Sequence, residues 1–429
     1  MLSVSKRTII GGAIGNALEM YDYVIWGLFS VYLSKEFLPP NAKLSDIFFL
    51  FLLTYILRPI GSLVGGILAD QAGRKKILTL SIFLMGICTS IVGILPSYAQ
   101  IGVSSVFLLL FIRLIQVFAV GSEYISSIAL LIESCDKQKR GYFGSWAAFG
   151  VNAGVLISSL FGSLILYLID LHVLPEWGWR FAFMLAFLTM LIGFWIRNSL
   201  PESLEFIAEN ARTEKRSFFD VLYEALAVFK SQTFDTFVVF SLVCFGVSTT
   251  ILIFIYAPIH MSTVNHLHNT HSFIINSSSL TLLVLLIPLF GLISDHLGRT
   301  KTVLMGCITL SFLSLPYFSV LSSGNFYQIL VAHTMMAIPC ASIFAVTPVL
   351  ITEIFPLSIR CSITNLIYSL AACIGGGITP LIAFKLEQYE SYLPGSILVI
   401  LGGVNILFLG VYMRRKHGLP PKLMLVSEL

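Results

Sequence analysis

Long apolar stretches recur along the chain, and the short segments between them hold most of the charged residues. Because a helix needs about 20 predominantly apolar residues to cross a bilayer, each stretch predicts a membrane-spanning helix. The approximate limits of twelve such spans are 8–34, 45–69, 77–96, 104–132, 141–169, 179–199, 236–260, 272–294, 302–322, 327–352, 361–385 and 395–413. The pattern therefore predicts an all-α membrane protein.

The longest polar connection, 201–235, divides six spans from six. We expect an N-terminal six-helix bundle at 1–199, a cytoplasmic central loop at 200–235, a C-terminal six-helix bundle at 236–416 and a short tail at 417–429. The first residues are too few, and too soon followed by acids at positions 19 and 22, to form a cleaved signal peptide. The first span is therefore expected to remain in the protein.

The composition fits this reading, since 57% of the residues are hydrophobic and 11% are charged, whereas soluble domains are about a quarter charged. With the N-terminus placed inside, 20 of the 26 Lys and Arg fall in inside segments and 4 in outside segments. Because positively charged loops stay in the cytoplasm, both termini are expected there. The net charge of +4 gives no sign of a nucleic-acid partner.

Two short motifs occur once in each half of the chain. The loop GGILADQAGRKK after the second span matches GLISDHLGRTK after the eighth, with an offset of 225 residues. The stretch LIESCDKQKR after the fourth span matches LITEIFPLSIR after the tenth, with an offset of 220. The order of the motifs is the same in both halves, so the chain reads as a duplicated six-helix unit.

These motifs predict a gate at the cytoplasmic ends of the helices. A glycine before the aspartate lets two helix ends approach closely. Asp70 can accept hydrogen bonds from helix-terminal N–H groups and pair with Arg74 or Arg140. The alternative is that the basic residues only anchor helix ends. The expected gate residues are Gly66, Asp70, Gly73, Arg74, Glu133, Arg140, Glu202, Gly291, Asp295, Gly298, Arg299, Glu353 and Arg360.

The G-x-L-x-D-x-x-G-R loop resembles the signature of the major facilitator superfamily. Within it, several stretches resemble the metabolite:proton symporters, which include proline/betaine, α-ketoglutarate and shikimate carriers. The stretches are GNALEMYDYVIWG, RLIQVFAVGSEY, KRGYFGSWAAFG, GWRFAFMLAF, and FPLSIR with GGGITPLIA. This resemblance implies a secondary active transporter with two six-helix bundles, a central solute site and alternating access, in the cytoplasmic (inner) membrane of a bacterium.

Two acids, Glu19 and Asp22, stand inside the apolar first span. A charged, unpaired carboxylate at that depth is costly, so each is paired, protonated or turned to a water-filled cavity. Helical spacing puts Glu19 on one stripe with Asn16 and Tyr23, and a second stripe in the fourth span carries Arg113 and Glu123. The candidates for proton coupling are Glu19, Asp22 and Glu123. The candidates for the solute pocket are Asn16, Tyr23, Arg58, Arg113, Gln116, Tyr124, Trp146 and Asn152.

A carboxylate beside a buried cation can hold or release a proton as its surroundings change, which is the physical basis of proton coupling. The acids can equally be fixed ion-pair partners that orient helices. We expect proton-coupled uptake of a small zwitterion, such as proline or betaine, or of a small organic acid. An exporter of metabolites or drugs, a non-transporting sensor, and coupling to another ion gradient remain open. Antiporters of the resembled family usually carry a Gly-Pro pair in the fifth span, and its lack between residues 141 and 170 favours symport or uniport.

No phosphate-binding loop of the G-x-x-x-x-G-K-[ST] type occurs, so ATP-driven pumping is not expected. The seven cysteines show no C-x-x-C pairing, which indicates packing residues and not disulfides or metal ligands. We expect no enzymatic activity, no cofactor and no metal. The expected partners are a small-molecule solute, protons and membrane lipid, and the protein is expected to be a monomer.

Overall fold

A computed structural model describes the backbone of residues 4–40, 44–121, 123–211, 217–265, 267, 269–323 and 325–417. The described residues are almost entirely helical, and they contain no strand. They form two compact units: unit 1 comprises Met1–Ala227 with Phe355–Ser369, and unit 2 comprises Val228–Ile354 with Leu370–Leu429. The domain boundaries predicted at 199/200, 235/236 and 416/417 stay a prediction.

Unit 1 holds the first six expected spans. Its helices are α1 (Val4–Leu28), α2 (Ser30–Phe37), α3 (Leu44–Ala72), α4 (Arg74–Ile94), α5 (Tyr98–Ile101), α6 (Ser104–Val120), α7 (Glu123–Glu133), η1 (Lys137–Lys139), α8 (Arg140–Asp170), η2 (Glu176–Trp179), α9 (Arg180–Asn198) and α10 (Leu204–Asn210). The first span divides at Phe29 into α1 and α2, and the fourth divides after Val120 into α6 and α7.

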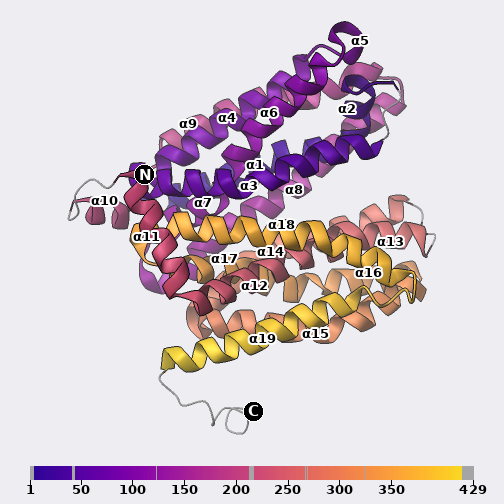
Figure 1. The fold of residues 1–429 in the computed structure, drawn as a ribbon. Helices are drawn as coiled ribbons and strands as arrows, with labels where there is room; N and C mark the ends of the chain where they lie inside the picture. The colour runs from indigo at the N-terminus through magenta and orange to yellow at the C-terminus, as the bar shows by residue number, and fades with distance from the viewer. Residues whose placement is uncertain are drawn as a thin grey trace. The chain divides into compact units, whose positions relative to one another are not determined.

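Small residues let the long helices of unit 1 pack closely. The helix α1 packs along α8, and α4 packs along both α6 and α9 (Figure 1). A Cβ atom added to Gly154 of α8 would lie 2.5 Å from the carbonyl oxygen of Ala17 in α1. Because lipid tails are as apolar as the side chains, such close backbone contact supplies much of the helix association in a membrane.

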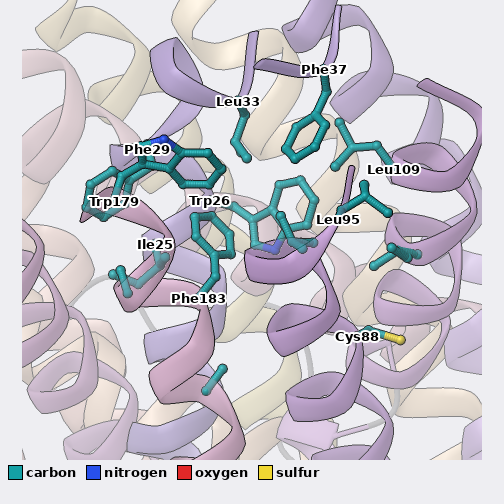
Figure 2. Packing of buried hydrophobic residues seen from close by; sticks show 14 of the residues in the cluster. Ile25, Trp26, Phe29, Leu33, Phe37, Cys88, Leu95, Leu109, Trp179 and Phe183 are labelled. Carbon is teal, nitrogen blue, oxygen red and sulfur yellow. The ribbon is translucent and has the colours of Figure 1, made fainter. Parts of the chain in front are cut away.

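An aromatic cluster fills one end of unit 1. Figure 2 shows Trp26 and Phe29 of the first span close to Trp179 and Phe183 of the sixth. The ring centroids of Trp26 and Phe183 are 5.8 Å apart, and those of Trp179 and Phe183 are 5.6 Å apart. Both pairs are edge to face. Since this geometry matches the ring quadrupoles, the cluster holds α1 and α9 in a defined register. That register also positions Asp22 and Glu19, which lie about one and two helical turns before Trp26.

The central loop contains helical segments. Residues 200–235 contain α10 and most of α11 (Phe218–Ser231), two short helices that the hydrophobic pattern did not predict. Ser203 begins α10 as an N-cap, since its hydroxyl accepts a hydrogen bond from the Phe206 N–H. The boundary between the two units falls within α11, after Ala227.

Unit 2 holds most of the last six expected spans. Its helices are α12 (Thr233–Thr250), the π-helix η3 (Ile251–Tyr256), α13 (Ala257–Thr263), α14 (Asn269–Leu297), α15 (Arg299–Ser323), α16 (Phe326–Met335), α17 (Ala337–Ile354) and α19 (Gly395–His417). The helix α15 packs against α17 and α19, and α14 packs against α17. The 3-10 turn η4 (Leu357–Ile359) belongs to unit 1, and α18 (Arg360–Glu387) crosses from unit 1 to unit 2 after Ser369.

The seventh span is continuous but not uniform, because a π-helical segment lies between α12 and α13. The Phe254 carbonyl within this segment accepts a hydrogen bond of 3.3 Å from the Asn276 side chain. Asn276 in turn contacts His333, whose other ring nitrogen lies 2.6 Å from the Tyr317 hydroxyl. In α13, the His260 side chain forms a hydrogen bond with Glu387 at the end of α18. Polar side chains therefore hold the chain within the irregular segment, at Phe254, and just after it, at His260.

Ten helical stretches among the described residues are long and apolar enough to cross a membrane. The expected spans 8–34 and 45–69 are not among the ten, and each includes residues whose side chains lie outside the described set. The count of twelve spans and the cytoplasmic position of the termini therefore stay predictions.

Candidate functional site

A buried group of two carboxylates and one guanidinium lies within unit 1. Glu123, at the start of α7, is fully buried, and its Oε1 lies 2.7 Å from Nη2 of Arg197, near the end of α9. Glu19 of α1 is 2% exposed and feels the charges of both Glu123 and Arg197. Oε2 of Glu19 has no hydrogen-bond partner among the described residues. Two acids thus lie near the buried Arg197, and Arg58 acts on Glu19 as well.

The sequence analysis missed Arg197, because a basic residue at the end of a span looks like a membrane anchor. The side chain is 2% exposed and turns inward, where its Nη2 also donates to Oδ1 of Asn16 at 3.4 Å. The space for it comes from Gly15, since a Cβ atom there would lie 2.6 Å from Arg197 Nε. In the structure, Ala186, Met190 and Gly193 form the buried face of α9 and Arg197 continues it; the sequence hint was the small residues Ala186 and Gly193 at helical spacing from Arg197.

A small pocket lies beside this group, within unit 1. It is lined by Asp22, Arg58, Met85, Arg113, Gln116, Val117 and Val120, from α1, α3, α4 and α6. Three of the expected pocket residues and one expected proton-coupling residue therefore lie together. Asp22 is 5% exposed, and its Oδ1 has no hydrogen-bond partner among the described residues. The pocket thus presents one acid and two permanent cations.

Neighbouring side chains fix the position of Arg113. Its guanidinium lies over the Trp26 ring, 4.6 Å from the centroid, a cation–π contact that gains strength away from water. The amide of Gln116, one turn along α6, lies 2.7 Å from the hydroxyl of Thr89 in α4, and Thr89 also hydrogen-bonds Asp22. Trp26, Thr89 and Met85 belong to this site and were not predicted, since none of them is charged.

The other expected pocket residues have different surroundings. Asn16 donates to the Ala147 carbonyl at 3.3 Å, and Asn152 donates to the Ala148 carbonyl within its own helix. Tyr124 packs on Tyr368, with ring centroids 5.4 Å apart, and Trp146 packs on Phe149 at 4.8 Å. The Tyr23 side chain lies outside the described residues. These residues do not line the described pocket, and a solute role for them stays a prediction.

Asp70, at the end of α3, binds the first turn of α18. Its carboxylate accepts hydrogen bonds from the Cys361 N–H at 3.2 Å, and from the N–H and hydroxyl of Ser362 at 2.7 and 2.6 Å. The first N–H groups of a helix have no partner in the helix and attract negative charge. The expected close approach is present as well: a Cβ atom on Gly66 would lie 2.7 Å from the Cys361 carbonyl oxygen.

Glu133 is the centre of the same cluster. Its Oε2 lies 3.1 Å from Arg74 Nε and accepts a 2.5 Å hydrogen bond from the Ser203 hydroxyl. Its Oε1 accepts from Arg360 Nη1 at 2.9 Å. Arg74 also pairs with Asp70 at 3.2 Å. Of the two expected partners of Asp70, the structure selects Arg74, and Arg140 is paired with Glu205 instead.

Glu202 caps α4. Its carboxylate accepts hydrogen bonds from the backbone N–H groups of Arg74 and Lys75 at 3.1 to 3.2 Å. Gly73, just before the helix, has φ +104°, a conformation that favours glycine. Gly298 repeats this before α15, with φ +95°.

In unit 2, Arg299 lies 2.7 Å from Glu353 and 3.5 Å from Asp295, as the repeated motif predicts. Arg360 does not join that second network, which is a correction to the expected grouping. It lies at the start of α18 within unit 1 and contacts Glu133 and Glu205. Among the described residues, no group of three or more His, Cys, Asp and Glu side chains is arranged to hold a metal ion.

A model of the Major Facilitator Superfamily matches residues 13–275 and 238–425, which together span nearly the whole chain. The chain belongs to the Major Facilitator Superfamily. As a member, it is a secondary transporter of small molecules, not an enzyme, and a multi-pass protein of the bacterial inner membrane.

Curated relatives resemble this superfamily member over most of its length. The glycine betaine/proline/ectoine/pipecolic acid transporter OusA of Dickeya dadantii is 29% identical over 433 residues, which cover 97% of this chain and 85% of that protein. The proline/betaine transporter of Escherichia coli is 28% identical over 425 residues, with coverage of 97% and 85%. The proline/betaine transporter of Salmonella typhimurium is 28% identical over 431 residues, with coverage of 97% and 85%.

Solved structures of other superfamily members share the fold. The proton:xylose symporter XylE, bound to 6-bromo-6-deoxy-D-glucose, superposes with a TM-score of 0.77 at 18% identity, and 96% of each chain is covered. A bacterial homologue of the iron transporter ferroportin, in its outward-facing state, gives a TM-score of 0.68 at 13% identity, with coverage of 97% and 100%. At these identities the likeness concerns the fold alone.

Proposed function

We propose that this protein is a proton-coupled symporter that takes up a small zwitterion of the proline or betaine type by alternating access. The names of the curated relatives support this solute class. The pocket beside Trp26 supports it independently, because it combines one carboxylate with two guanidinium groups. A zwitterion carries the two complementary charges in one small molecule.

The observation that carries the coupling is the pair of buried carboxylates, Glu19 and Glu123, near Arg197. Glu19 and Glu123 are both buried, and the Arg197 guanidinium acts on both of them, while Arg58 acts on Glu19 as well. Like charges this close disfavour simultaneous ionisation, and an uncompensated charge inside a membrane protein is costly. One proton bound by this pair removes the repulsion between its two carboxylates. Release of that proton at the cytoplasmic side then couples its downhill movement to the solute.

The cluster around Glu133 supports the gating step. Asp70, Arg74 and Arg360 together hold the start of α18 through several charge-assisted hydrogen bonds. Such bonds are stronger than neutral ones, and α18 is continuous from unit 1 into unit 2. A cytoplasmic opening that moves the start of α18 must break these bonds. The cluster therefore acts on the equilibrium between conformations and not on the pocket.

Proteoliposomes that contain the purified protein test this proposal. Labelled proline, glycine betaine, α-ketoglutarate and shikimate are supplied outside, with and without an inwardly directed proton gradient. We expect accumulation of proline or glycine betaine that depends on the gradient. A small organic acid is the second candidate, because two cations line the pocket; gradient-driven uptake of α-ketoglutarate alone would replace the zwitterion with it. Accumulation that requires an outward gradient, or that a sodium gradient drives, would refute proton-coupled uptake.

Glu123→Gln separates coupling from reorientation. Gln resembles the protonated acid but cannot release a proton, so the variant is expected to lose accumulation while it still exchanges internal for external solute. Glu36→Gln is the matched control, because Glu36 also contacts an arginine at 2.7 Å but is about a third exposed. If Glu19→Gln and Glu123→Gln both accumulate solute normally on a pH gradient, neither carries the proton.

A further inference from the structure

The pocket in unit 1 contains a polar atom that the protein itself leaves unsatisfied. Oδ1 of Asp22 is buried without a hydrogen-bond partner among the described residues, although the carboxylate as a whole also bonds Thr89. A buried acceptor without a partner costs about 1–3 kcal/mol, and more when it is charged. Asp22 also lines the pocket. A ligand that donates a hydrogen bond there would remove this penalty.

The remaining lining shows what kind of cation fits. A quaternary ammonium is usually held by the faces of aromatic rings, yet none of the seven residues that line this pocket is aromatic. The nearby Trp26 ring is already covered by the Arg113 guanidinium, at 4.6 Å. The pocket therefore has a hydrogen-bond acceptor for a cation but no aromatic surface for one.

We infer that Asp22 binds the N–H groups of the solute's ammonium, and that the carrier selects primary and secondary amino acids over quaternary betaines. This inference rests on the proposed function, whose solute class it narrows. Arg58 and Arg113 bind the carboxylate of the same solute, since guanidinium groups suit a carboxylate. Asp22 is then a specificity residue, and the Glu19–Glu123 pair handles the proton.

Selection of this kind is strong for a physical reason. A site built to hydrogen-bond an N–H group rejects an analogue without it, because the buried acceptor is left unpaired. Glycine betaine offers three methyl groups in place of the donors. The present cavity volume of about 20 Å³ admits little more than a water molecule, so the pocket must widen to take a solute. The chemistry of its lining is unaffected by that widening.

A series of proline analogues with increasing N-methylation tests the inference on the purified full-length protein in detergent. Displacement of bound labelled L-proline is measured with proline, N-methylproline, N,N-dimethylproline and glycine betaine. Pipecolic acid is the size control, because it adds a carbon atom and keeps both N–H groups. We expect pipecolic acid to bind nearly as well as proline, and N,N-dimethylproline to bind about 10- to 100-fold more weakly. Asp22→Asn should weaken proline binding by a similar factor and remove most of the difference between the analogues.

Asp170→Asn, at the exposed end of α8, is the control and should leave the relative affinities of the analogues unchanged. Equal displacement by proline and N,N-dimethylproline overturns the inference. An Asp22→Asn protein that keeps the wild-type differences in affinity between the analogues overturns it as well. If Asp22→Asn does not fold, the affinities of the analogues for the wild-type protein test the inference by themselves. If labelled proline does not bind, labelled glycine betaine replaces it as the probe, and its binding also overturns the inference. Gradient-driven uptake in proteoliposomes still tests the proposed function separately.

Discussion

The buried group of Glu19, Glu123 and Arg197 in unit 1 predicts an asymmetry between two substitutions. Arg197→Met removes the only one of the three groups that is positive, and leaves two carboxylates buried, with Glu123 fully inside and Glu19 2% exposed. Removing one partner of a buried ion pair costs about 3–5 kcal/mol, because the other charge remains uncompensated. We expect a loss of folding free energy in this range.

Glu123→Gln should cost much less. Glu19 still compensates the charge of Arg197, and the amide oxygen of the introduced glutamine can still accept from the guanidinium. A single weakened hydrogen bond corresponds to about 1 kcal/mol. The expected difference between the two variants is therefore about 2–4 kcal/mol, by subtraction of these ranges.

Unfolding of the purified protein by SDS in mixed micelles measures both changes. Glu36→Gln is again the matched control, and because its ion pair with Arg180 is partly exposed, we expect a change below about 1 kcal/mol. In a background of Glu19→Gln and Glu123→Gln, Arg197→Met strands no charge and should cost little. Equal losses for Arg197→Met and Glu123→Gln would refute the shared-cation arrangement, since Glu19 would then not compensate.

Three further changes test other parts of the structure. Asp70→Asn weakens the binding of the first turn of α18 and its pair with Arg74, so turnover should fall at least about tenfold while equilibrium solute binding persists; binding lost in parallel would count against a gating role. Arg113→Lys keeps the charge but loses the planar guanidinium that lies over Trp26, and should weaken solute binding about tenfold or more in a displacement assay; unchanged binding would remove it from the site. Gly15→Ala puts a methyl group against Arg197 and should destabilise the protein by about 1–3 kcal/mol in the SDS titration, and wild-type stability would show that Arg197 can move aside.

Much of the fold follows from the sequence, because hydrophobic length and the repeated loop motif act locally. The expected spans match helices closely at α4, α8 and α9, and the family resemblance is confirmed. The breaks inside spans were not predicted. The change from α1 to α2 at Phe29 follows Gly27 by two residues, but a single glycine inside an apolar span does not by itself predict a break.

The candidate site was only partly predictable, since it depends on which faces of the helices meet. Helical spacing places Glu19 and Asp22 about 60° apart, but it does not reveal that one lies near Arg197 while the other lines a pocket with Arg113. The pairing of Arg360 with Glu133 joins residues 227 positions apart. Nothing local in either motif distinguishes that pairing from one within the same half.

The π-helix Ile251–Tyr256 has a consequence for how this span compares with an unbroken helix. A π turn holds one residue more than an α turn, so every side chain after it is rotated by about 100° from the face that a straight α-helix would give it. His260 reaches Glu387 from that rotated face. Removing one residue from 251–256 would restore a regular helix and turn His260 away from its partner. An alignment with a relative that lacks the extra residue therefore needs a one-residue gap within this span, and without that gap it matches the wrong faces of α13.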